Sequence, residues 1–135
     1  MTESESMLLV TYQTAHPTFL VVATDPKFLK FLDMSLKLEF ECIVLAVTSG
    51  WDAVKKAEQI KPDLFMLDYH LLDSNALVLS HRLHTIRELA SIPTIFLNSP
   101  GPSWSDPQMD NTVFLSMSFS LAELYTAVYK SLDRA

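Results

Sequence analysis

The residues best suited to chemistry are Asp68 and His70, which follow the apolar run of residues 64–67. A short continuous apolar run is typical of a parallel strand covered on both faces, and parallel sheets present their reactive groups at the carboxyl ends of strands. Asp68 is therefore the first candidate for a reactive carboxylate. His70 lies two residues later, so its side chain can lie on the same side as that of Asp68, and the two could exchange a proton.

Other chemical signals are weaker. His81 and His84 lie three residues apart on an expected helix and could share a metal ion, but with no third ligand in view we interpret them as solvated surface residues. Cys42 is the single cysteine, which excludes an internal disulfide, and its apolar neighbours indicate a small buried side chain. The chain has two glycines, and no phosphate-cradling glycine loop or nucleophile elbow is recognisable.

Strands that alternate with helices are expected to position Asp68. Short apolar runs predict strands at residues 19–23, 42–47, 64–67, 94–97 and 113–115. Helical spacing and capping residues predict helices that begin after Asp25, at residue 50, near residue 75 and after Ser120, the third running to about residue 89. Parallel strands need crossover connections, so this α/β pattern predicts a doubly wound, five-stranded parallel sheet in the flavodoxin-like order 2-1-3-4-5.

Two segments depart from this alternation. Residues 98–111 contain three prolines, which disfavour a long helix, so we expect a loop with at most one helical turn and a shortened or missing fourth helix. Residues 1–17 form an extension ahead of one domain of residues 18–135. Within the extension, residues 7–12 are apolar and β-prone, so they could form an extra strand or contact a partner.

The composition disfavours several classes of function. Ten basic and sixteen acidic residues give a net charge of −6, which disfavours sequence-independent binding to nucleic acid or to an anionic membrane. No apolar run approaches the roughly 18 residues of a membrane span. The acidic N-terminus lacks the basic region of a signal peptide, so a cytoplasmic protein with protein partners is expected.

Several landmarks share their order and spacing with one known family. They are residues 62–64 leading to Asp68, residues 71–77, residues 92–95 and residues 119–124. From Phe19 to Asp133 the chain thus resembles the receiver domain of a response regulator in two-component signalling. The resemblance implies a non-enzymatic signalling domain in which Asp68 accepts a phosphoryl group from a histidine kinase with the help of Mg²⁺.

The residues around the acceptor depart from the pattern that the resemblance implies. Ala23 and Thr24 stand where receivers carry two acids, Asn98 where they carry a Thr or Ser, and Met117 where they carry a Lys. Asp25 lies one position late and is interpreted as a helix cap rather than a metal ligand. Because hard cations prefer several carboxylates and phosphoryl transfer needs compensating charge, Mg²⁺ binding at the acceptor is expected to be weak.

These departures favour an atypical receiver, or pseudo-receiver, that acts mainly through protein contacts with a histidine kinase or a downstream signalling protein. Its contact surface would comprise the proline-rich loop, the fifth strand and the last helix, and candidate anchors on it are Trp104, Phe119, Leu121 and Tyr125. Homodimerisation through this face is left open. The alternative keeps phosphorylation at Asp68, with a Mg²⁺ site rebuilt from Asp25, Asp73 or water.

Overall fold

The computed structural model describes residues 16–105 and 111–134. The strands are β1 (Thr18–Val22), β2 (Ile43–Val47), β3 (Leu64–Asp68), β4 (Thr94–Ser99), β5 (Trp104–Ser105) and β6 (Thr112–Ser116). The helices are α2 (Pro26–Glu39), α3 (Gly50–Ile60), α4 (Ala76–Thr85), the short 3₁₀ helix η1 (Arg87–Leu89) and α5 (Leu121–Arg134). The strand or partner contact predicted at residues 7–12 lies outside the described residues.

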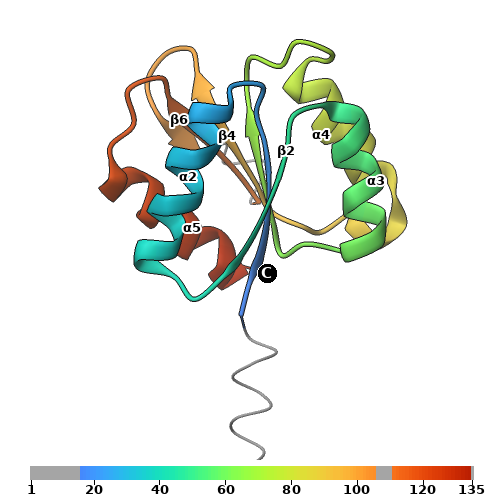
Figure 1. Ribbon diagram of the computed structural model, residues 1–135, viewed down its shortest axis with the longest axis horizontal. Helices are drawn as coiled ribbons and strands as arrows, with labels where there is room; N and C mark the ends of the chain where they lie inside the picture. Colours follow the sequence, from blue (N-terminus) through green and yellow to red (C-terminus); the bar gives the residue numbers. More distant parts are fainter. Residues whose placement is uncertain (1–15, 106–110, 135) are drawn as a thin grey trace, which may run out of the picture.

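The strands form one sheet in the order β2-β1-β3-β4-β6-β5. All pairs are parallel except β5 with β6. Helices α2 and α5 cover one face and α3 and α4 cover the other (Figure 1). The predicted doubly wound sheet and its strand order are therefore confirmed, with β6 as the predicted fifth strand. None of the described helices is long and apolar enough to cross a membrane.

Strand β3 supplies side chains to a hydrophobic core on each face of the sheet. Leu64 and Met66 pack in the core beneath α2 and α5, and Phe65 and Leu67 pack in the core beneath α3 and α4. Every residue of β3 is buried. This explains why the strand reads as an unbroken apolar run rather than as an alternating one.

The helices begin at capping residues that the sequence predicts. The Asp25 carboxylate accepts a hydrogen bond from the Lys27 backbone N–H at 2.9 Å. At α5, the Ser120 hydroxyl accepts from the Glu123 N–H at 3.1 Å, while the Ser120 N–H donates to the Glu123 carboxylate at 3.1 Å. This reciprocal pair is the predicted capping box. Its backbone hydrogen bond, with a second bond from the Ser103 hydroxyl, lowers the pKa of Glu123.

The third predicted helix is shorter than expected. It ends at Thr85, and Ile86 is extended before η1 begins. The last turn tightens because the Thr85 hydroxyl donates to the Arg82 carbonyl and the Ile86 N–H donates to the Leu83 carbonyl. Such i to i+3 closure is common at helix ends, and β-branched residues favour leaving the helix there.

The proline-rich segment differs from the expected loop. No helix occurs in its described part, residues 98–105 and 111, and Trp104 with Ser105 instead forms the antiparallel edge strand β5. Trp104 stacks on Phe114, and Phe114 stacks on Phe96, each with ring centroids 4.8 Å apart. This row of three rings, the aromatic ladder, runs across β4, β6 and β5 on the face that carries α3 and α4.

We expect the two ends of the aromatic ladder to differ in their contribution to stability. Phe96 is 2% exposed and Trp104 is 46% exposed. Phe96→Ala should lower the free energy of unfolding by about 3–5 kcal/mol because it leaves a cavity. Trp104→Ala removes mainly one stacking contact and should cost about 1–2 kcal/mol. Urea unfolding gives the free energy of unfolding of both variants. Equal losses of that free energy would contradict the assignment of Phe96 to the core.

The cap of α2 gives a second prediction. Asp25→Ala should lower the free energy of unfolding by about 1 kcal/mol, since the Lys27 N–H loses its acceptor. Asp25→Asn keeps an acceptor oxygen and should cost at most about 0.5 kcal/mol, the part due to the helix dipole. Thermal or urea unfolding would compare the pair, and an equal loss for both variants would mean that capping is not the role of this side chain.

Candidate functional site

Asp68 is the last residue of β3 and lies at the carboxyl edge of the sheet, between β1 and β4. It is 8% exposed, and its register partner on β4 is Leu97. One carboxylate oxygen accepts a hydrogen bond from the His70 backbone N–H at 3.0 Å. The fold therefore holds Asp68 where a parallel sheet presents its chemistry, and the carboxylate also stabilises the turn that follows it.

The end of β1 contributes no acid to the surroundings of Asp68. Ala23 is fully buried and carries no ligand atom. The Thr24 hydroxyl oxygen is buried and has no hydrogen-bond partner. Asp25 is exposed, and its carboxylate caps its own helix. The two positions where a receiver would carry acids thus offer a methyl group and a neutral hydroxyl.

Asp73 is also occupied elsewhere. Its two carboxylate oxygens lie 3.1 and 2.9 Å from the Gly50 backbone nitrogen, at the start of α3. A carboxylate at a helix N-terminus is stabilised by the unpaired N–H groups and the helix dipole. Asp73 therefore attaches the loop after β3 to α3, and this contact argues against its use in a rebuilt metal site.

The residues present do not fit a Mg²⁺ site. Among residues 16–105 and 111–134, no group of three His, Cys, Asp or Glu side chains is placed to hold a metal ion. Mg²⁺ prefers oxygen ligands in near-octahedral geometry and is usually held by one or two carboxylates. The two carboxylates considered for a rebuilt site are already engaged, because Asp25 caps α2 and Asp73 accepts from the start of α3.

Asn98 interrupts β4 with a bulge that sequence reasoning missed. Its φ is 57°, in the left-handed region, and the register between β4 and β6 shifts between Phe96 and Ser99. Asn adopts this conformation more readily than most residues. β4 therefore continues to Ser99, beyond the predicted end at residue 97. Interpreting Asn98 as a residue that ends the strand is therefore wrong, and the only sequence signal for the bulge was the Asn itself before Ser99 and Pro100.

Met117 follows β6 and is 67% exposed, so its thioether side chain reaches solvent. It supplies no positive charge to the carboxylate of Asp68. Electrostatic stabilisation of phosphoryl transfer relies on cations placed around the transferring group. The edge of the sheet thus carries the candidate acceptor without the cation that the resemblance implies.

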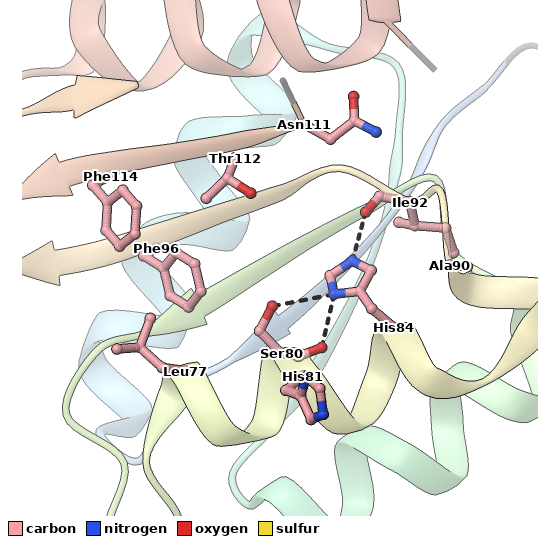
Figure 2. A pocket seen from close by; sticks show the side chains of 10 residues that line it. All are labelled: Leu77, Ser80, His81, His84, Ala90, Ile92, Phe96, Asn111, Thr112 and Phe114. Carbon is pink, nitrogen blue, oxygen red and sulfur yellow. Dashed lines mark hydrogen bonds between the residues drawn. The ribbon is translucent and has the colours of Figure 1, made fainter. Parts of the chain in front are cut away.

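The histidines do not form the arrangements considered from the sequence. His70 contacts Asp68 through its backbone N–H, and its ring packs edge-on to Tyr69 with centroids 5.4 Å apart. The two ring nitrogens of His84 lie 2.7 Å from the Ser80 carbonyl oxygen and 2.8 Å from the Ile92 carbonyl oxygen (Figure 2). His84 therefore ties α4 to the loop before β4, which is a structural role rather than surface solvation.

A groove of about 510 Å³ lies beside His84, between α4 and the strands β4 and β6. Figure 2 shows Leu77, Phe96 and Phe114 toward one end and His84, Ile92 and Asn111 toward the other. A second groove of about 360 Å³ lies between β5 and α5 and is lined by Trp104, among others. Phe114, the middle ring of the aromatic ladder, lines both grooves.

The four candidate anchors divide into exposed and internal residues. Trp104 is 46% exposed and Leu121 is 41% exposed. Phe119 is half-buried and packs edge-on to Phe28, with centroids 6.3 Å apart. Tyr125 is half-buried too, and its hydroxyl donates to the Ser35 carbonyl at 2.8 Å. Only Trp104 and Leu121 are therefore available as principal contacts on this face.

Cys42 is half-buried beside the core of α2 and α5. Burial is the main cause that raises the pKa of its thiol. The thiolate is the reactive form of cysteine, so this environment favours the unreactive thiol.

Comparison with known proteins places the fold. No protein-family model matches the chain, and no curated protein matches it in sequence. A candidate response regulator from Chloroflexus aurantiacus superposes with a TM-score of 0.76 at 22% identity, over 88% of this chain and 99% of that one. The receiver domain of a signal transduction histidine kinase from Syntrophus aciditrophicus superposes with a TM-score of 0.73 at 22% identity, over 87% of this chain and 90% of that one.

A chemotaxis response regulator of Vibrio cholerae has a TM-score of 0.74 at 14% identity, over 87% of this chain and all 100% of that one. Likeness at this level of identity shows the fold alone. The chain has the receiver-domain fold of response regulators.

Proposed function

We propose that this protein is an atypical receiver domain of two-component-type signalling that acts through protein contacts, with Mg²⁺-dependent phosphorylation of Asp68 impaired. The observation that carries the proposal is the environment of Asp68. Asp68, the candidate acceptor, ends β3, while β1 is followed by Ala23 and Thr24 where acids would be needed and Met117 supplies no cation. The proposal includes a cytoplasmic location and no enzymatic activity.

The proposed partner is a protein, either a histidine kinase or a downstream signalling protein. The contact surface is the groove between β5 and α5 with its rim, in particular Trp104 and Leu121. Ser103 holds this surface in shape, because its hydroxyl donates to the Glu123 carboxylate at 2.9 Å and accepts from the Ser116 N–H at 2.9 Å. A preorganised surface loses less conformational entropy on binding than a flexible one.

Phosphorylation gives the most direct test of the proposal. Wild-type protein incubated with Mg²⁺ and a small phosphodonor should show no phosphate adduct by intact mass spectrometry, because the site lacks the charges that stabilise the transferring group. Asp68→Asn is the matched variant, and a receiver with a complete acidic pair and Lys is the positive control. An adduct on wild type that is absent from Asp68→Asn would instead support the alternative, a phosphoryl-accepting response regulator.

The contact surface gives a separate prediction. The double variant Trp104→Ala with Leu121→Glu should lose at least about 90% of the partner that wild type captures from host lysate, since central apolar anchors contribute roughly 2 kcal/mol or more each. Trp51→Ala is the matched control, because Trp51 is 66% exposed but lies on α3. Capture by the double variant equal to that of the Trp51→Ala control would show that the partner binds elsewhere.

A further inference from the structure

Strand β2 lies at one edge of the sheet and, among the described residues, pairs with β1 alone (Figure 1). The Ile43 N–H donates to the Pro17 carbonyl, and the Val47 carbonyl accepts from the Ala23 N–H. In a parallel pair the residues of a strand alternate between the two sides. Ile43, Leu45 and Val47 therefore direct their backbone groups toward β1, and Val44 and Ala46 direct theirs outward.

This outer edge lacks the features that normally protect an edge strand. β2 reads Ile-Val-Leu-Ala-Val, without charge, proline or glycine, and Ile43 is 53% exposed. Exposed apolar edges with open N–H and C=O groups readily pair with another strand, and proteins usually cover them or place charges and prolines on them. The composition of β2 suits an edge that is covered.

The residues just before β1 contact the start of β2. The His16 Nε2 atom lies 3.0 Å from the Glu41 carboxylate, two residues before β2 begins. Pro17 then accepts from the first residue of β2. Fifteen residues precede His16, and they include the apolar, β-prone residues 7–12. This segment is thus tethered at the start of β2, where a strand antiparallel to β2 would end.

We propose that residues 7–12 pair with the outer edge of β2 as an antiparallel strand. The lengths agree, because β2 has five residues and the segment has six. Residues 13–16 must then pass from the new strand beneath β2 to Pro17, which already lies in line with β1. That path covers two strand spacings, about 10 Å in total, and four extended residues reach about 13 Å.

A tethered segment also has an advantage over a second copy of the chain. A short flexible link gives an effective concentration in the millimolar range, whereas a second copy must be recruited from solution. An antiparallel edge strand on a parallel sheet is a common arrangement. The segment would also cover the exposed side of Ile43 and supply hydrogen-bond partners for Val44 and Ala46.

Amide hydrogen exchange, followed residue by residue by NMR, tests this pairing. In the full chain the amides of Val44 and Ala46 should exchange at least about tenfold more slowly than in a variant that lacks residues 2–15. The amides of Ile43, Leu45 and Val47 face β1 and should exchange equally slowly in both proteins. This alternation separates a lost edge strand from general destabilisation.

Two point variants of the full chain make the test independent of truncation. Leu9→Pro should accelerate exchange at Val44 and Ala46, because proline disrupts a paired strand. Thr14 belongs to the connecting residues, so Thr14→Pro should leave amide exchange at Val44 and Ala46 unchanged. Fast exchange at Val44 and Ala46 in the unaltered full chain would overturn the proposal. Slow exchange that depends on protein concentration, with dimers in sedimentation, would overturn it in favour of a second copy.

Discussion

The burial of β3 on both faces is the constraint on which the rest of the structure depends. Its backbone pairs with β1 and β4, and its side chains alternate between the two cores. A strand enclosed in this way cannot shift its register by one residue without moving its side chains to the opposite core. The place of Asp68 at the edge of the sheet is thus fixed by the packing of Leu64, Phe65, Met66 and Leu67, whatever chemistry the carboxylate performs.

The same packing explains how the fold persists while the site departs from the receiver pattern. At the edge where a receiver would gather negative charge around a cation, polar side chains instead complete the helix ends: Asp25 caps α2, Asp73 binds the start of α3, Asn75 caps α4 and Glu123 closes the capping box of α5. Each contact satisfies N–H groups that a helix leaves unpaired and complements its dipole. These contacts stabilise the fold without a bound cation.

The sequence was sufficient for most strands and helices because their signals are local, and the strand order was predicted from the flavodoxin-like topology that such an alternation favours. Short apolar runs, Asp25 before Pro26 and the Ser120–Glu123 pair each specify an element from a few neighbouring residues. The features that the sequence did not predict depend on contacts between distant residues. Strand β5 exists because Trp104 pairs with Phe114, and the bulge at Asn98 exists because β4 must pair with β6 beyond it. Such contacts join residues distant in sequence, so local patterns carry little information about them.

The proline-rich segment shows how one such distant contact changes a surface. A crossover helix in this place would cover the sheet beside α4, whereas here β5 adds Trp104 to the rings of Phe114 and Phe96, and grooves lie beside α4 and beside α5. The three prolines disfavour a long helix, and β5 is held on β6 by the stacking of Trp104 on Phe114 and by the hydrogen bond from the Ser116 N–H to the Ser103 hydroxyl. Since Ser103 joins this strand to Glu123 at the start of α5, the altered segment and the last helix form one continuous surface. The described part of this single connection therefore shapes the face on which the proposed partner would bind.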